Sequence, residues 1–442
     1  MGASVLSRLK RLCVSETGAF DRAATEHVGS QGLPQDTRAE DAGYTLRAMR
    51  GRDETHGDLM AASRARILTT HVGSLPRPHD LLDLMKAKLS GAAYDRPAYD
   101  ARVRSAVAEI VRHQIESGID VVADGEMSKP GFFTYVAERL EGFEPRPGKS
   151  PRTFARERDA FPEYYAEYFK RAMLGGAVAP MAPMFCVGPV RYKGEAALQR
   201  DLDNLKAALG ARDPSTAFVP AIAPSGVGYN DRYASEEEYL GAVAEALRIE
   251  YRAIVDAGFL LQIDDPFLSD IFVDPALDAA GMKRKAGLYV EAVNHALRGI
   301  EPARVRYHTC YGINEGPRIH EAPLAEVAPA MLRIAAGAFS FEAANPRHEH
   351  EYHLWETVKL PDGKSILPGV ITHASNIVEH PELIAERLVR FANLVGRERV
   401  MASADCGFSS QASYKTEVHP TVIWAKFRAL AEGARLASAR VF

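Results

Sequence analysis

A histidine and a cysteine that are two residues apart, His308 and Cys310, follow a short apolar run and are the first candidates for chemistry. Residues i and i+2 of a β-strand face the same side, so an imidazole nitrogen and a thiol would point to one place. Two later apolar runs are followed by further metal-binding side chains, Glu342 and Cys406. Two cysteines, a histidine and a glutamate suit tetrahedral zinc. A His-x-Cys pair is also common in buried cores, so this spacing alone leaves both interpretations open.

Composition and charge indicate chemistry on small molecules. The 442 residues are 46% hydrophobic and 25% charged, which allows a sizeable core, and the net charge of -4 gives no sign of a nucleic-acid or membrane-surface partner. Four scattered cysteines are too few for a disulfide framework. The chain has no apolar run of the ~18–20 residues that a membrane span needs, and no signal-peptide pattern. We therefore expect a cytoplasmic protein with reduced thiols, and the oligomeric state stays open.

Residues 1–59 differ from the rest because they mix charged and small polar residues with little periodicity. Such a segment has too little patterned apolar surface to pack, so it is predicted to be a poorly ordered extension. Residues 60–442 are predicted to form one catalytic domain.

Strand-like and helix-like segments alternate along that domain. The strand candidates are residues 67–72, 121–123, 184–190, 218–223, 259–263, 305–307, 339–341, 367–371 and 400–402. The helix candidates are residues 99–117, 198–209, 236–257, 283–297, 324–335, 381–395 and 418–436. Repeated strand–helix units predict a parallel α/β sheet, either doubly wound or closed as a (β/α)₈ barrel. Nine strand candidates for eight barrel positions mean that one lies outside, and the pattern does not identify it.

The polar residues that follow these strands favour the barrel. They are His71 and Ser74, Asp124 and Glu126, Asp264 and Asp265, His308 and Cys310, Glu342, His373, and Asp405 and Cys406. In a barrel the C-terminal strand ends converge on one mouth, where active sites of this fold lie. Such convergence is hard to explain by core packing, so it favours the metal interpretation of His308 and Cys310. No glycine-rich loop for a nucleotide accompanies them.

These motifs resemble, in order and approximate spacing, the catalytic half of the cobalamin-independent methionine synthase family. The matching stretches are residues 69–76, 124–126, 263–266, 308–311, 341–342 and 405–407, and the resemblance covers roughly residues 66–432. It implies a (β/α)₈ barrel that uses zinc to transfer a methyl group to the thiol of homocysteine, as in methionine biosynthesis. It also implies two small-molecule partners, the thiol and a methyl or alkyl donor.

The resemblance implies roles for individual residues. The zinc ligands would be His308, Cys310, Glu342 and Cys406. The residues that bind the amino-acid head of homocysteine would be Ser74, Glu126 and Asp264. His373 would lie beside the site and donate a proton. Two thiolate ligands weaken zinc as a Lewis acid, which suits a bound sulfur nucleophile better than the activation of water.

The sequence also departs from the family. Residues 191–194, Arg-Tyr-Lys-Gly, replace a tryptophan-bearing segment that resembles a pterin platform, which argues against methyl-folate as the donor. Residues 342–364 resemble a stand-alone branch that includes epoxyalkane:coenzyme M transferase, so alkylation of another thiol is the alternative. The carboxylates of Glu126 and Asp264 favour an ammonium-bearing thiol over a sulfonate.

Two other classes stay open: a metal-free decarboxylase of the uroporphyrinogen type, and a non-catalytic zinc protein. A second histidine-rich stretch, with His348, His350 and His353 between glutamates, indicates a charged surface hairpin more than a further metal cluster.

Overall fold

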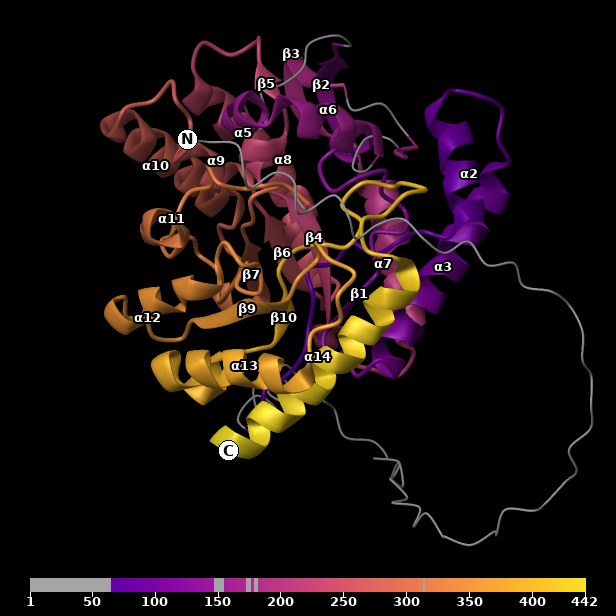
Figure 1. Ribbon diagram of the computed structural model, residues 1–442. Coiled ribbons are helices and arrows are strands. Elements are labelled where there is room, and N and C mark those ends of the chain that lie inside the picture. Colours follow the sequence, from indigo (N-terminus) through magenta and orange to yellow (C-terminus); the bar gives the residue numbers. More distant parts are fainter. Residues whose placement is uncertain (1–64, 147–154, 172–175, 179–181, 313–314) are drawn as a thin grey trace, which may run out of the picture. The chain divides into compact units, whose positions relative to one another are not determined.

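Short parallel strands alternate with helices over most of the chain (Figure 1). The computed structural model describes residues 65–146, 155–171, 176–178, 182–312 and 315–442. All of them belong to one unit, Asp53–Phe442. The other unit, Met1–Arg52, and the extension expected over residues 1–59 lie outside the described residues, so that expectation stays a prediction.

The barrel is built from one parallel sheet. Within the described ranges it has seven strands in the order β1-β4-β6-β7-β8-β9-β10. Their bounds are β1 Val122–Ala123, β4 Ala217–Ile222, β6 Leu260–Asp264, β7 Val305–His308, β8 Ala338–Phe341, β9 Ser365–Ile371 and β10 Ser403–Ala404. Every residue of β4, β6 and β7 is buried, as expected for strands that are covered on both faces.

The extended segment around Thr69 closes the circle between the two edge strands. Thr69 forms a parallel bridge with Ala402, and the Thr70 N–H donates to the Ala402 carbonyl at 2.8 Å. On its other side, the Val121 N–H donates to the Thr69 carbonyl at 3.0 Å. The predicted (β/α)₈ barrel is therefore confirmed, with residues 67–72 completing the ring.

The strand candidate outside the barrel is residues 184–190. It forms β3 (Met184–Tyr192) in a separate three-stranded sheet with β2 (Leu140–Pro145) and β5 (Tyr229–Asn230). Cys186 is the one fully buried residue of β3, whereas a central barrel strand is buried throughout. β3 contains Gly188 and Pro189, residue types that are disfavoured inside a fully buried barrel strand.

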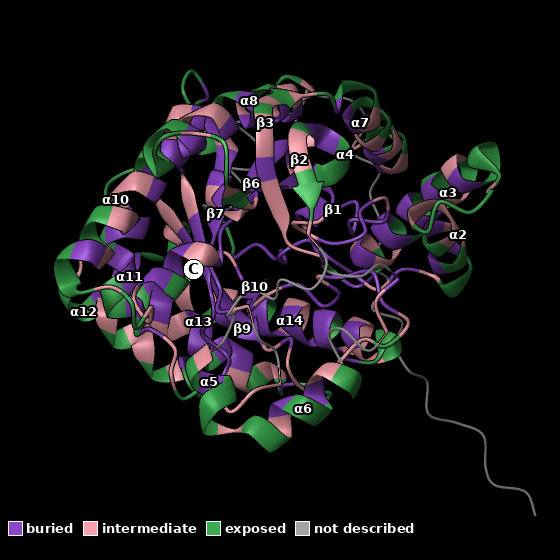
Figure 2. Ribbon diagram, turned by 90° about the horizontal axis from the view of Figure 1, so that it is seen from above, coloured by how far each residue is buried: buried purple, intermediate pink, exposed green. Residues whose placement is uncertain are grey.

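Helices form an outer layer around the strands (Figure 2). Their bounds are α2 His79–Leu89, α3 Arg96–Glu116, α4 Val136–Arg139, α5 Ala155–Ala160, α6 Pro162–Arg171, α7 Glu195–Leu209, α8 Glu236–Asp256, α9 Phe267–Ile271, α10 Ala279–Ala296, α11 Leu324–Met331, α12 Leu354–Thr357, α13 Pro381–Val395 and α14 Pro420–Val441. The seven helix candidates correspond to α3, α7, α8, α10, α11, α13 and α14, while α2, α5 and α6 were not anticipated. Local signals set the boundaries: the Ser235 hydroxyl accepts the Glu238 N–H at 3.1 Å and so caps α8. In the described part of the chain, no helix combines the length and apolarity needed to cross a bilayer.

Candidate metal centre

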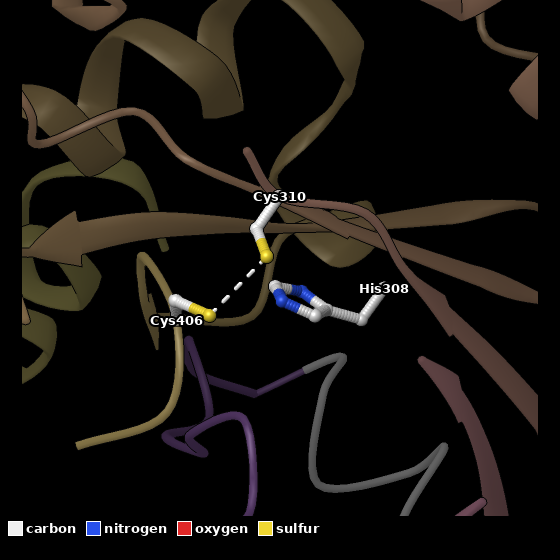
Figure 3. Close-up of side chains that lie close together, drawn as sticks. All are labelled: His308, Cys310 and Cys406. Atoms are coloured by element: carbon white, nitrogen blue, oxygen red, sulfur yellow. Dashed lines mark hydrogen bonds between the residues drawn. The ribbon is translucent and has the colours of Figure 1, made fainter. Parts of the chain in front are cut away.

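Three of the expected metal ligands lie together at the C-terminal end of the barrel (Figure 3). His308 ends β7, Cys310 follows two residues later, and Cys406 follows β10 two residues after Ala404. Their ligand atoms all lie within 4.8 Å of one another, and the two sulfur atoms are 3.4 Å apart. We call these three residues the triad.

The imidazole of His308 is oriented by one hydrogen bond and has one nitrogen left over. Its Nδ1 atom lies 3.1 Å from the Ser340 hydroxyl on the neighbouring strand β8. Its Nε2 atom is buried and has no hydrogen-bond partner among the described residues. A buried polar atom without a partner is costly unless something else binds it. An imidazole nitrogen beside two sulfurs is a donor set that suits zinc, so the residues present fit this ion.

The protonation states agree with this fit. Burial lowers the pKa of His308 to about 3, so the ring is neutral at neutral pH and can act as a ligand. The hydrogen bond to Cys310, together with burial, raises the pKa of Cys406 well above its usual value. The Cys406 thiol therefore stays protonated by itself, whereas a divalent cation bound to its sulfur would stabilise the thiolate.

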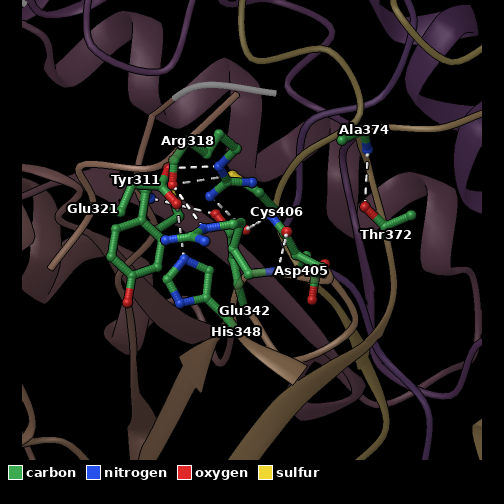
Figure 4. Close-up of polar contacts among 12 residues, drawn as sticks. Tyr311, Arg318, Glu321, Glu342, His348, Thr372, Ala374, Asp405 and Cys406 are labelled. Carbon is green, nitrogen blue, oxygen red and sulfur yellow. Dashed lines mark hydrogen bonds and ion pairs between the residues drawn. The ribbon is translucent and has the colours of Figure 1, made fainter. Parts of the chain in front are cut away.

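Glu342, the fourth expected ligand, is not part of this group. It follows β8, and its Oε2 atom forms an ion pair with Nη2 of Arg318 at 2.8 Å (Figure 4). The same oxygen accepts a hydrogen bond from Asn345 at 3.1 Å, and Oε1 accepts the Tyr311 N–H at 3.4 Å. Burial alone would raise the pKa of Glu342, but the nearby groups, with Arg318 first among them, together outweigh burial and lower this pKa to about 2. The carboxylate is therefore ionised and already bound.

A second cluster lies beside the triad and consists of Glu342, His373 and Asp405. Burial lowers the pKa of His373 to about 4, and His373 is not among the residues that line the cavity described next. Burial and the charge of Glu342 raise the pKa of Asp405 to about 7. One oxygen of Asp405 accepts the N–H groups of Ala343 and Ala344, both at 2.8 Å, so Asp405 fixes the chain directly after Glu342. The proton-donor role of His373 stays a prediction.

A cavity of about 1480 Å³ opens over the triad. Its lining includes all three triad residues and all three residues expected to bind the amino-acid head: Ser74, Glu126, Asp264, His308, Cys310 and Cys406. Ser74 lies beside Gly407, the residue that directly follows Cys406 of the triad. The Ser74 hydroxyl oxygen would be only 1.9 Å from a Cβ atom placed on Gly407. These six side chains therefore line one space, and their roles in binding metal and substrate stay predictions.

Glu126 has an unusual backbone and two cationic neighbours. Its φ of 59° is rare for a residue other than glycine, and such conformations concentrate at functional sites. Its carboxylate lies 3.7 Å from the cationic nitrogens of Arg77 and Lys129. Its Oε2 atom is buried and forms no hydrogen bond within the described ranges. Glu126 thus has an oxygen that can accept a hydrogen bond from a ligand in the cavity.

Asp264 lies near Glu126, and the two carboxylates influence each other. Burial first, and then the negative charge of Glu126, raise the pKa of Asp264 well above its usual value. Its Oδ1 atom accepts a hydrogen bond from Gln262 at 2.7 Å. The sequence did not point to Arg77 or Lys129, although Arg77 directly follows the 69–76 motif and Lys129 lies three residues after Glu126.

Three other polar residues from the strand ends are structural. His71 uses both ring nitrogens internally: Nε2 lies 2.7 Å from the Gln114 side-chain oxygen, and Nδ1 accepts the Gly73 N–H at 3.1 Å. Asp265 accepts hydrogen bonds from the hydroxyl groups of Ser225 and Tyr307, both at 2.9 Å. Asp124 accepts the Glu126 N–H at 2.9 Å and so supports that turn. Burial among good partners explains these residues without a catalytic role.

The histidine-rich stretch is neither a second metal cluster nor a surface hairpin in the described part of the chain. Residues Glu349–His353 form a short 3₁₀ helix, and His348 just before it is buried. The His348 ring stacks on Tyr311 at 4.1 Å and lies 2.8 Å from both Glu321 and Glu351. Although burial opposes it, these two carboxylates raise the pKa of His348 to about 9, so the ring is a buried cation. The hairpin prediction was wrong because tertiary contacts outweigh the local charge pattern.

Comparison with known proteins agrees with this geometry. A family model described as "Cobalamin-independent synthase, Catalytic domain" matches residues 67–148 and 221–424. A protein named methionine synthase from Sulfurisphaera tokodaii is 24% identical over 343 residues, which are 77% of this chain and 85% of that protein. A 5-methyltetrahydropteroyltriglutamate–homocysteine methyltransferase from Streptomyces coelicolor is 25% identical over 371 residues, which are 81% of this chain and 42% of that longer protein.

Solved structures show the same fold. A B12-independent methionine synthase from Shewanella sp. W3-18-1, in complex with selenomethionine, superposes with a TM-score of 0.66 at 20% identity, covering 85% of this chain and 99% of that one. A putative vitamin-B12-independent methionine synthase from Listeria monocytogenes gives a TM-score of 0.59 at 19% identity, covering 84% and 98%. The matched ranges of the family model leave out residues 149–220, which contain β3.

Proposed function

The chain belongs to the family of cobalamin-independent synthase catalytic domains, and from this premise we propose that it is a zinc-dependent enzyme that methylates the thiol of homocysteine to form methionine. The main support is the triad: within the described part of the chain, the buried Nε2 atom of His308 has no hydrogen-bond partner, it lies beside two sulfurs, and all three residues line a large cavity. The curated relatives whose names include methionine synthase or homocysteine methyltransferase support the same reaction.

We assign zinc binding to His308, Cys310 and Cys406. Methyl transfer to sulfur needs a thiolate, and a free thiol with a pKa of ~8.5 is mostly protonated at neutral pH. Zinc bound to the triad would supply the positive charge that stabilises the substrate as a thiolate. The barrel contributes the orientation of His308, whose ring is held by Ser340.

We assign the amino-acid head of homocysteine to the group of Ser74, Glu126 and Asp264. Glu126 is suited to bind the ammonium group because it lines the cavity and its buried Oε2 atom accepts no hydrogen bond within the described ranges, although Arg77 lies 3.7 Å away. Asp264 and Ser74 line the same cavity and can complete the recognition. An ammonium group placed between the two carboxylates would also relieve their mutual repulsion, which contributes to the raised pKa of Asp264.

The methyl donor is a separate question, because the outer cavity differs from the family pattern. Met184 and Phe185 of β3 line it, and β3 lies in the range that the family model does not match. Phe132, Phe133 and Tyr229 add aromatic surface. The outer cavity can therefore accept a donor with a large apolar part, and methyl-folate has to be tested alongside other donors.

A second candidate function is the alkylation of a thiol that carries a sulfonate, as in the epoxyalkane:coenzyme M transferase type. One observation favours it. Arg77 and Lys129 flank Glu126 at 3.7 Å, so the carboxylate does not present an uncompensated negative charge to a ligand. A sulfonate in this region would face two acids whose charge Arg77 and Lys129 partly offset from behind the cavity lining, so its repulsion is weaker than the carboxylates alone would produce.

Competition between the two thiols tests the proposal. Zinc-loaded protein is titrated with homocysteine and with coenzyme M, and binding is followed by calorimetry. We expect homocysteine to bind at least ~10-fold more tightly, since its ammonium group gains a hydrogen bond to a charged partner. Methionine should then form when homocysteine is supplied with an active methyl donor, beginning with 5-methyltetrahydropteroyltriglutamate. Tighter binding of coenzyme M would move the function to the second candidate, and no binding of either thiol would contradict both.

A further inference from the structure

We propose that Asp405 is a positioning residue of the metal centre. Its carboxylate reaches across strand β9 and joins the segment that carries Cys406 to the turn after β8, the strand that also holds His308. This inference rests on the proposed function, because it concerns the same site. It assigns a task to a carboxylate that does not line the cavity.

The triad is assembled from strand ends that are not neighbours in the sheet. His308 ends β7 and Cys406 follows β10, while β8 and β9 lie between these two strands. Metal affinity depends on how exactly the ligands are held by the residues behind them. The geometry of the triad therefore depends on contacts that join the end of β7 to the end of β10.

Strand β8 fixes the His308 side of the triad. The Ser340 hydroxyl lies 3.1 Å from Nδ1 of His308 and so orients the ring. The Ser340 carbonyl accepts the Thr309 N–H at 3.1 Å, which holds the backbone just before Cys310. Two of the three triad residues are thus placed relative to β8.

Asp405 places the third triad residue relative to the same strand (Figure 4). One oxygen of its fully buried carboxylate, Oδ1, accepts the N–H groups of Ala343 and Ala344, both at 2.8 Å. The Asp405 N–H donates to the Ile371 carbonyl of β9 at 3.0 Å. Hydrogen bonds to a carboxylate are strong and directional. Because Cys406 is the next residue, these three bonds fix where its backbone starts.

Gly369 of β9 makes this crossing possible. It pairs with Ser403 of β10, and the register of the two strands shifts directly after Ser403, an irregularity that re-aims the following side chains. A Cβ atom on Gly369 would lie only 2.2 Å from Oδ1 and 2.4 Å from Cα of Asp405. A glycine in a strand often marks such a close approach. The strand between β8 and β10 thus lacks a side chain where Asp405 passes over it.

The test separates the position of the acceptor from its charge, and it measures zinc affinity of the metal-free protein in competition with a chelator. Asp405→Ala leaves two buried N–H groups without their acceptor and should weaken zinc binding by ~10–100-fold, with far-UV circular dichroism unchanged. In Asp405→Asn, the amide oxygen can accept both N–H groups, so the zinc affinity should match the wild type. Asp405→Glu keeps the charge but moves the acceptor by one methylene group, so it should weaken zinc binding and provides the answer if Asp405→Ala does not fold.

The matched control is Asp213→Ala. Asp213 also accepts a backbone N–H, that of Ser215 at 2.7 Å, but it precedes β4 and so lies at the opposite end of the barrel from the metal centre. Its replacement removes a similar hydrogen bond without touching the ends of β8 and β10. The zinc affinity of this variant should match the wild type, which separates a loss of positioning from a general loss of stability.

An unchanged zinc affinity in Asp405→Ala, or in Asp405→Glu where the alanine variant does not fold, would overturn this proposal. A loss in Asp405→Asn as large as that in the other variants would also overturn it, because the charge and not the hydrogen bonds would then matter. The comparison needs no thiol, so it decides the role of Asp405 even if homocysteine is not the acceptor. Conversely, failure of homocysteine to bind would refute the proposed function and leave the affinity result intact.

Discussion

Replacing Cys406 or Cys310 by alanine is expected to strip the metal and reduce methyl transfer more than ~100-fold, because even the partners of metal ligands typically change affinity or activity by 10–100-fold. Each variant leaves one sulfur and His308 in the triad, which is too few protein ligands for a stable zinc site. The barrel should remain folded, since its core consists of packed apolar residues along the strands and helices. Plasma emission spectrometry measures the loss of zinc, and far-UV circular dichroism checks that the barrel remains folded.

The matched control is Cys186→Ala. Cys186 is a fully buried cysteine of β3, outside the triad and the barrel sheet. The Cys186→Ala variant should keep its zinc and most of its activity, and we expect it to lose a small amount of folding stability. Full zinc occupancy in the Cys310/Cys406 double variant would show that zinc binds at a site other than the triad.

Replacing Glu126 by glutamine is expected to lower kcat/KM for homocysteine by ~10–100-fold, which corresponds to the ~1.5–3 kcal/mol of a hydrogen bond to a charged group. The change keeps the shape of the side chain but removes the charge that faces the ammonium group. Asp264→Asn should also lower kcat/KM for homocysteine. Steady-state kinetics with homocysteine, and with a homocysteine analogue that lacks the amino group, measures the effect: the analogue should not distinguish the variants.

Glu250→Gln is the control for this series. Glu250 is equally buried, but it binds the hydroxyl groups of Tyr135 and Tyr192 at 2.8 Å and does not line the cavity. It should leave the KM for homocysteine unchanged. If Glu126→Gln behaves like this control, the unpartnered oxygen of Glu126 has no role in recognition, and coenzyme M becomes the thiol to test first.

The sequence predicted the barrel, and one shared mouth for the candidate site residues, for one physical reason. Parallel strands in a barrel bring their C-terminal ends together, so the residues after each strand, such as Ser74, Asp264 and Cys406, can be assigned to one mouth without coordinates. The same argument could not separate the catalytic from the structural candidates. His71 and Asp265 follow strands too, but their partners Gln114 and Tyr307 are close only in the folded chain.

Long-range charge pairing accounts for what the sequence did not reveal. Arg318 lies in an irregular connection without periodicity, and nothing local indicates that it binds Glu342. The argument for an ammonium-bearing thiol treated Glu126 as a bare carboxylate, whereas Arg77 and Lys129 each lie 3.7 Å from it in the folded chain. Such distances between side chains depend on tertiary packing, which composition and spacing do not encode.

Sulfur coordination of the metal tests the central claim most directly. X-ray absorption at the zinc edge is recorded on the zinc-loaded protein before and after homocysteine is added. The proposed site predicts two sulfur ligands at first, from Cys310 and Cys406, and three once the substrate thiol binds. A shell that stays at two sulfurs with saturating homocysteine would contradict direct activation of the thiol by the metal and would leave zinc with a structural role.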